Sequence, residues 1–134
     1  MVVIRQMHID DFDGRTSVED PVKLVAHLST VRKGPYGAFI LSHSDDGASL
    51  WVHINGNVAY VHFFPAAGHP GFQPAGMTPP DCDEDVHFIQ TDGGEGGSFD
   101  MWRGALVPVA VAYEAASEFF AAPMRPSSIT WTEL

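Results

Sequence analysis

Basic residues and cysteine are scarce in this 134-residue chain. Seven Lys and Arg residues stand against 17 Asp and Glu residues, which gives a formal net charge of −10. A surface this acidic repels nucleic acid and anionic lipid, so we expect neither nucleic acid nor membrane as a partner. Cys82 is the only cysteine. An internal disulfide is therefore excluded, which fits a reducing compartment.

Long apolar runs are also missing. No stretch approaches the roughly 20 apolar residues needed to span a bilayer. The N-terminus lacks the charged segment and apolar segment of a secretory signal peptide. We therefore expect a cytoplasmic protein. Because 45% of the residues are apolar, the chain can bury a core, and its length predicts a single domain over residues 1–134.

The hydrophobic pattern and the turn residues predict an α+β fold. We expect a mostly antiparallel sheet of about five to seven strands with two helices packed on it. A helix is predicted from Ser17, with Ser17 and Asp20 at capping-box spacing and Val22 and Leu28 in its apolar stripe. A turn is predicted before it, and a second helix after Pro108. The predicted ranges are strands at 2–9, 38–42, 50–64 (a hairpin), 86–90, 98–103 and about 129–131, a turn at 10–14, an irregular connection at 65–85 and the second helix at 109–121.

The clearest local signal is the hairpin, in which Asn55-Gly56 separates two β-rich runs. Period-two alternation assigns its side chains to two faces. The face predicted to form core contains Leu50, Val52, Ile54, Ala59, Val61 and Phe63. The opposite, amphipathic face contains Trp51, His53, Val58, Tyr60 and His62.

This amphipathic face has three interpretations. It is a polar sheet face that carries rings, or a contact patch with Trp51 and Tyr60 as partner-binding residues, since aromatics are enriched at interfaces. In the third interpretation, His53 and His62 hold a metal ion with another ligand. No carboxylate at strand spacing supports that site, so we predict neither a metal nor a cofactor.

The acidic run D-C-D-E-D spans Asp81 to Asp85. It is either a solvated loop or an acidic prong that enters the basic groove of a partner. An EF-hand loop is not predicted, because Val86 stands where that loop needs glycine and Asp92 where it needs glutamate. The negative neighbours of Cys82 disfavour a thiolate, so a catalytic cysteine is not predicted.

A glycine-rich turn, Gly93 to Gly97, follows the acidic run. It lacks the Lys-Ser/Thr ending of a phosphate loop, and Glu95 would repel phosphate. We interpret it as a hairpin turn.

The C-terminal segment from Val107 combines a helix, a turn and a strand. Alanines and the paired Phe119-Phe120 precede an Arg125-Pro126 turn and a strand that ends with Trp131. This ending resembles the immunity protein 1 family of bacterial polymorphic toxin systems. The early helix, the A-F-I-L strand, the L-W-V-H-I-N-G-N hairpin and the glycine-rich turn follow in the family's order. Pro123 departs from the pattern, because it stands near the place of the family's usual glycine.

The resemblance implies an immunity protein without enzymatic activity. Members bind and neutralise a cognate toxin encoded by a neighbouring gene, often a nucleic-acid deaminase and sometimes a nuclease. An acidic protein complements a basic substrate groove, so occlusion of the groove or the active site is expected. The alternative is a small ligand-binding or hydrolytic domain with a pocket of His53, His62 and Tyr60. The candidate partner-binding residues are Asp81, Asp83, Glu84, Asp85, Asp92, Glu95, Trp51 and Tyr60.

Overall fold

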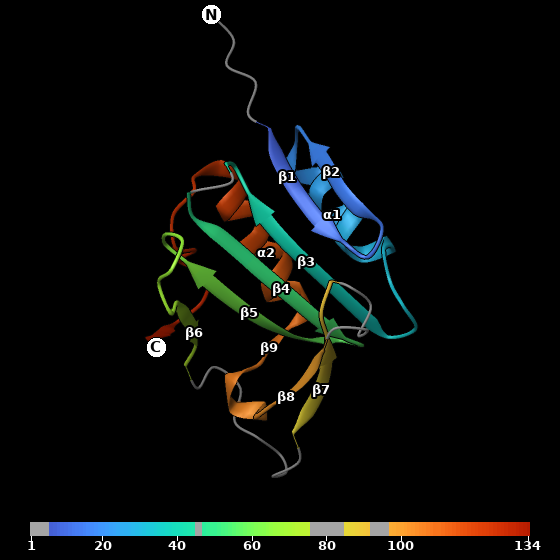
Figure 1. Ribbon diagram of the computed structural model, residues 1–134, viewed down its shortest axis with the longest axis vertical. Helices are drawn as coiled ribbons and strands as arrows, with labels where there is room; N and C mark the ends of the chain where they lie inside the picture. Colours follow the sequence, from blue (N-terminus) through green and yellow to red (C-terminus); the bar gives the residue numbers. More distant parts are fainter. Residues whose placement is uncertain (1–5, 45–46, 76–84, 92–96) are drawn as a thin grey trace, which may run out of the picture.

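The computed structural model describes residues 6–44, 47–75, 85–91 and 97–134 (Figure 1). Its main sheet has the strand order β10-β6-β5-β4-β3-β1-β2, and β9 also pairs with β5. The strands of this sheet are β1 (Met7–Asp11), β2 (Gly14–Val18), β3 (Tyr36–Ser42), β4 (Ser49–Asn55), β5 (Val58–Phe64), β6 (Phe72–Pro74), β9 (Val107–Pro108) and β10 (Trp131–Glu133). A second sheet pairs β7 (Val86–Ile89) with β8 (Ser98–Met101).

Two α-helices accompany the sheets, α1 (Pro21–Thr30) and α2 (Val109–Ala121), with a 3-10 turn, η1 (Arg103–Ala105). Each strand pair among the described residues is antiparallel. The predicted α+β fold with a mostly antiparallel sheet and two helices is confirmed. Neither α-helix in these residues is long and apolar enough to cross a membrane.

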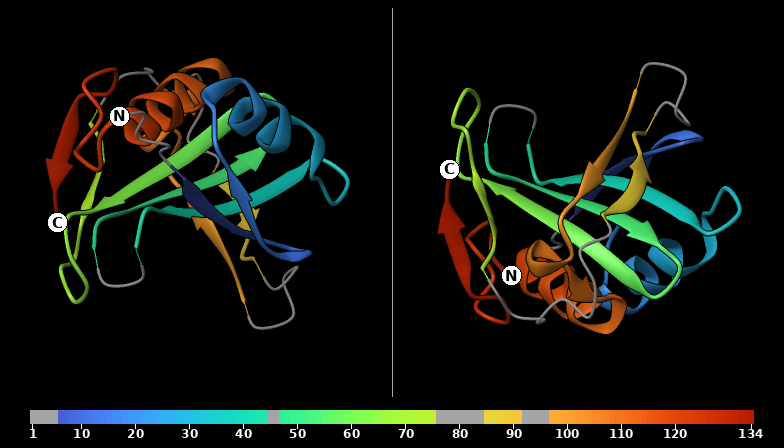
Figure 2. Two further views of the ribbon diagram at one scale, coloured as in Figure 1. Left: turned by 90° about the horizontal axis from the view of Figure 1, so that it is seen from above. Right: turned by 90° about the horizontal axis from the view of Figure 1, so that it is seen from below.

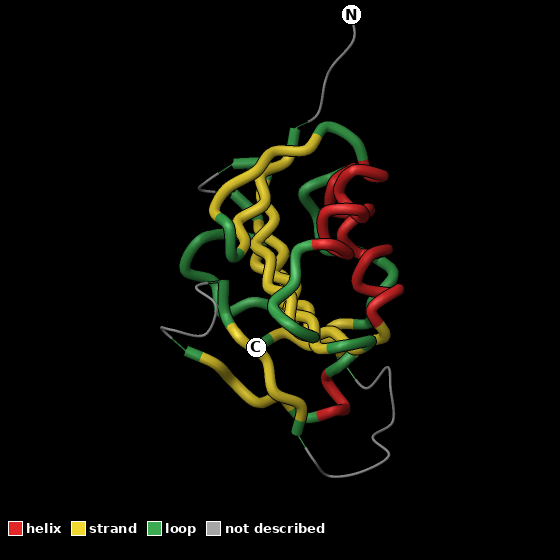
Figure 3. Tube along the Cα trace, turned by 90° about the vertical axis from the view of Figure 1, so that its right-hand side faces the viewer, coloured by secondary structure: helices red, strands yellow, loops and turns green. Residues whose placement is uncertain are grey.

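The main sheet has unlike partners on its two faces. Both α-helices cover one face, and the β7–β8 hairpin lies on the other (Figures 2 and 3). The principal core lies between the sheet and the helices, because pleating sends alternate apolar side chains towards them. Leu24 and Leu28 of α1 and Phe119 of α2 are fully buried there.

The β4–β5 hairpin confirms the predicted faces. Leu50 pairs with Phe63 and Val52 with Val61 on the core face, and Trp51 pairs with His62 on the other. Asn55 pairs with Val58, so the two-residue loop is Gly56-Asn57, one position later than the Asn-Gly signal. Gly56 has φ +62, a conformation that glycine adopts at low cost.

The prediction for the N-terminal region was wrong in two places. The chain does reverse at Phe12-Asp13, but β1 continues to Asp11 and β2 begins at Gly14, so Ser17 lies in a strand opposite His8. The helix therefore starts later, at Pro21. Its N-cap is Asp20, whose side chain accepts a hydrogen bond of 2.8 Å from the backbone N–H of Lys23. Strand pairing with β1 overrides the capping-box spacing of Ser17.

The apolar stripe of α1 also differs from the prediction. Leu24 and Leu28 form its buried face, whereas Val22 is 78% exposed. Since the helix begins only at Pro21, Val22 lies in its first turn and points away from the sheet. His27 shares the inward side, where its ring lies edge-on to Phe39 at 6.1 Å between centroids.

The C-terminal half shows one confirmation and two corrections. α2 has the predicted bounds, with Phe119 and Phe120 buried. The connection predicted to be irregular contains β6, which joins β5 to β10. The terminal strand begins at Trp131, which is only partly buried, while Ile129 is buried just before it.

Candidate partner-binding face

The sheet face opposite the helices carries polar and aromatic side chains. One row of paired residues crosses five strands of this face. From β5 to β2 the row reads His62, Trp51, Ile40, Asp10 and Arg15. The sequence analysis identified only the hairpin part of this row, because the register of β1, β2 and β3 was not available from local pattern.

The β7–β8 hairpin covers one end of this face. His53 is 3% and Tyr60 5% exposed. The Phe99 ring of β8 lies 4.9 Å from the His53 ring and 5.9 Å from the Tyr60 ring. Tyr60 joins Val86, Phe88 and other residues in a second, smaller core. Tyr60, predicted to contact a partner, is therefore not at an open surface, because a hairpin distant in sequence buries this end of the face.

Burial keeps the covered side chains uncharged. It lowers the pKa of His53 to about 4 and raises the pKa of Tyr60 to about 12, because desolvation disfavours each charged form. The Tyr60 hydroxyl donates to Oε1 of Gln73 at 2.9 Å. His62 has a lowered pKa, also through burial, and its Nε2 donates to the carbonyl oxygen of Pro70 at 3.0 Å. These groups are engaged in structural hydrogen bonds.

The described residues contain no group of three His, Cys, Asp or Glu side chains that could hold a metal ion. His53 donates from Nδ1 towards the carbonyl oxygen of Ile89 at 3.4 Å. The two histidines of the hairpin therefore contact separate backbone carbonyls.

The face contains two adjoining hollows, one at its uncovered end and one at the edge of the hairpin. The larger, of about 370 Å³, extends from the Asp10–Arg15 pair across Ile40 to the loop at Ala66–His69. The smaller, of about 250 Å³, is lined by His53, Tyr60 and His62 of the β4–β5 hairpin and by Phe99 and Met101 of β8. Trp51 and Phe64 line both hollows. We call these two side chains the aromatic ridge.

The aromatic ridge is held by its neighbours. The Trp51 indole N–H donates to Oγ of Ser49 at 3.1 Å, and its ring lies 5.2 Å from that of Phe64. The Phe64 ring stacks on His62 at 4.1 Å with an interplanar angle of 13°. Phe64 was missed in the sequence analysis, although period-two alternation from His62 assigns it to this face.

The segment of the chain that forms β3 to β8 contains acidic residues but no lysine or arginine. Between Lys33 and Arg103 the sequence has no lysine or arginine. The same stretch supplies β3 to β8 and contains nine acidic residues: Asp45, Asp46, Asp81, Asp83, Glu84, Asp85, Asp92, Glu95 and Asp100.

Of the acidic residues predicted to bind a partner, only Asp85 lies among the described residues. Asp85 is exposed directly before β7. Asp81, Cys82, Asp83, Glu84, Asp92 and Glu95 lie outside the described residues. In the sequence these acids precede β7 or lie between β7 and β8.

No family model matches the chain. Over 129 residues it is 27% identical to a double-stranded DNA deaminase immunity protein of Burkholderia cenocepacia (strain H111). The chain is similar to an immunity protein. The alignment covers 96% of this chain and 100% of the relative. The likeness therefore extends well beyond the C-terminal helix, turn and strand.

Proposed function

We propose that this protein is an immunity protein that binds and neutralises a cognate toxin encoded by a neighbouring gene. The observation that carries the proposal is the similarity, over nearly the full length of both chains, to a double-stranded DNA deaminase immunity protein. By the same likeness, the toxin is a nucleic-acid deaminase; the family resemblance of the C-terminal segment gives a nuclease as the second choice. The protein acts by binding and not by catalysis.

The mode of inhibition that we propose is occlusion of the toxin's active site or substrate groove. An enzyme that handles nucleic acid needs positive charge along its groove. A protein of net charge −10 complements such a groove, and complementary charge speeds association and rejects wrong partners. Asp81, Asp83, Glu84, Asp85, Asp92 and Glu95 are proposed to make the acidic contacts, with Trp51 as the aromatic one. Tyr60 is buried and is therefore not proposed as a direct contact.

The test is a growth-rescue assay with a binding measurement. The product of the neighbouring toxin gene is expressed with this protein, without it, and with an immunity protein from a different toxin system. We expect rescue only by this protein and a complex that survives purification. Toxicity that persists despite soluble expression of this protein would overturn the proposal.

The alternative function, a ligand-binding or hydrolytic pocket of His53, His62 and Tyr60, has less support. Two of these side chains are almost fully buried, and all three are engaged in hydrogen bonds. A general base or nucleophile must reach its substrate.

A further inference from the structure

We propose that the aromatic ridge of Trp51 and Phe64 is the principal docking point for the toxin and that it receives a cationic side chain from a protruding basic segment of that partner. This inference rests on the proposed function. The proposed contact is one defined hollow and not the whole acidic surface. The group of the toxin that enters this hollow is positively charged.

The shape of the site favours a protruding segment. The main hollow of about 370 Å³ is bounded by β1 and β3 on one side and by the loop after β5 on the other. That loop is fixed to the sheet, because His62 donates to the carbonyl oxygen of Pro70 and the His69 ring stacks on Phe72 at 5.6 Å. Because this loop is already ordered, it loses little conformational entropy when a partner binds.

The chemistry of the ridge favours a cation. The one polar atom of the Trp51 side chain is occupied by Ser49, so the ring offers chiefly its π surface to a partner. A guanidinium or ammonium group over a tryptophan face is attracted by the ring quadrupole. Partly buried aromatic side chains in a hollow are also the usual centres of binding energy.

The surrounding charge points the same way. Asp10 and Arg15 line the hollow, and Arg15 binds Asp10 through Nε at 2.9 Å and Nη2 at 3.1 Å. Arg15 and Asp10 thus neutralise each other, so this pair adds no net positive charge to the hollow. The net charge of the protein is −10, and the sequence between Lys33 and Arg103, which supplies β3, β4 and the loop after β5, contains no lysine or arginine. The partner group that fits an aromatic ring surface on a protein of net charge −10 is an arginine or lysine from the basic groove of a toxin that acts on nucleic acid.

The decisive experiment compares two exposed alanines on opposite faces. Ala67 lines the hollow, whereas Ala26 lies on α1 on the helix-covered side. Ala67→Arg fills the hollow and adds a repelling charge, and Ala26→Arg makes the same chemical change away from it. Binding to an inactive variant of the neighbouring gene's toxin is measured by calorimetry. We expect Ala67→Arg to raise Kd by roughly tenfold or more and Ala26→Arg to leave it unchanged.

A second pair of variants tests the chemistry of the contact. Trp51→Phe keeps an aromatic ring, whereas Trp51→Leu keeps apolar bulk without one. We expect the leucine variant to lose more affinity than the phenylalanine variant, because only the latter offers a π face to a cation. Circular dichroism establishes that each variant is folded, and Ala67→Arg decides the matter if Trp51→Leu is not.

The outcomes separate the two proposals. A wild-type protein that neither binds nor protects overturns the proposed function and this inference together. If the wild-type protein protects the cell and the Ala67→Arg variant binds the toxin as tightly as the wild type does, only the inference about the hollow is overturned. Self-association of the free protein that Ala67→Arg abolishes would show that a second copy occupies the hollow, which also overturns it.

Discussion

Nε2 of His27 lies 2.5 Å from Oδ2 of Asp11, and this contact fastens α1 to β1. The Asp11 side chain is 1% exposed. Its other oxygen, Oδ1, accepts the backbone N–H of Asp13 at 2.8 Å. Both carboxylate oxygens are therefore satisfied inside the protein, which is how a buried acid is tolerated.

Replacing His27 by Ala should destabilise the protein by about 2–3 kcal/mol, because it leaves one buried carboxylate oxygen without its donor. Chemical denaturation measures the loss. His8→Ala is the control: His8 belongs to the same β1–β2 hairpin but pairs with Ser17 on the exposed side. Equal effects of the two substitutions would contradict the structural role of the buried pair.

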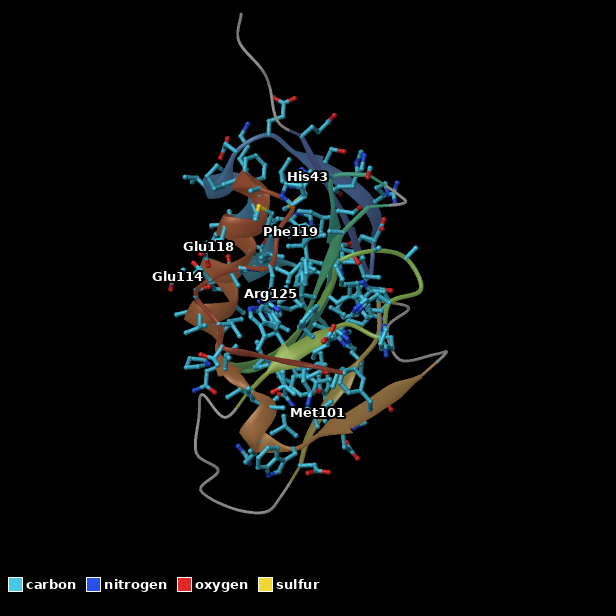
Figure 4. All side chains as sticks on the ribbon, turned by 90° about the vertical axis from the view of Figure 1, so that its left-hand side faces the viewer. His43, Met101, Glu114, Glu118, Phe119 and Arg125 are labelled. Atoms are coloured by element: carbon cyan, nitrogen blue, oxygen red, sulfur yellow. The ribbon has the colours of Figure 1, made fainter. Side chains whose placement is uncertain are left out.

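Glu118 should contribute more to the stability of the fold than Glu114, which lies one turn earlier in α2. Both glutamates extend from the outer side of α2 (Figure 4). Glu118 accepts hydrogen bonds from the backbone N–H groups of Ser127 and Ser128 and from the Ser127 hydroxyl. Burial raises its pKa, but these bonds outweigh burial and leave the pKa lowered.

We expect Glu118→Ala to cost about 1–2 kcal/mol in the free energy of unfolding. Glu114→Ala should stay within about 0.5 kcal/mol, as exposed substitutions usually do. Hydrogen exchange at Ser127 and Ser128 would show the cause directly, since their amides should exchange faster only in the first variant. Unchanged protection there would refute the anchoring role of Glu118.

Acid should weaken the fold through His53. Its pKa of about 4 in the folded protein lies below its ordinary value of 6.5. Between these values the unfolded chain binds a proton that the folded protein does not, so stability falls as the pH drops from about 6.5 and this loss levels off below about 4. The difference amounts to about 3 kcal/mol at its acid limit.

In a His53→Phe variant, the free energy of unfolding should not show this loss at low pH. Urea unfolding of both proteins from pH 7.5 to pH 4.5 measures it as the difference between two curves. Curves that stay parallel over this range would mean that His53 titrates normally and is not buried as described.

Trp131 should contribute to stability in two separable ways. Its ring packs against Phe63 at 6.3 Å, and its indole N–H donates to the carbonyl oxygen of Pro126 at 2.8 Å. Trp131→Phe removes the hydrogen bond and should cost about 1 kcal/mol. Trp131→Ala also removes most of the packing and should cost about 2–3 kcal/mol, less than a fully buried tryptophan. An unchanged denaturation midpoint in the alanine variant would show that β10 is not docked.

Reversing the charge of Asp83, Glu84 and Asp85 to Lys should slow association with the toxin at least tenfold at low salt, because electrostatic steering governs encounter more than dissociation. The rates are measured by surface plasmon resonance over a range of salt concentrations. Lys substitution of Asp13, Glu19 and Glu114, three exposed acids outside the loop, gives a control with the same net charge. If both triple variants associate at one rate, net charge and not the acidic loop steers the encounter.

Local sequence signals predicted the parts of the fold that depend on neighbours in the chain. The β4–β5 faces followed from period-two alternation, and the bounds of α2 followed from Pro108 and Pro123. Ser17 was misassigned because a strand partner nine residues away, His8, decides its conformation. Pairing with a neighbouring strand outweighs the local secondary-structure propensity of a residue.

The candidate face was predictable only in part. Alternation assigned Trp51 to this face, and its role as a contact residue stays a prediction. No local signal shows that Phe99, 39 residues after Tyr60, covers that tyrosine. The hollow itself brings together β1, β2, β3, β4 and the loop after β5. Its existence depends on strand order, which alternation alone does not encode.

The pairing of β5 with β4, β6 and β9 has a consequence for the order of folding. The contacts of the β3–β4–β5 meander are close in sequence and can form early, whereas β9 and α2 come from the last third of the chain. Contacts that close long loops form late. A nascent chain on the ribosome would thus expose the apolar side of the meander until α2 has been synthesised. Pairing of β9 with β5, directly before α2, then places that helix where it can cover this side.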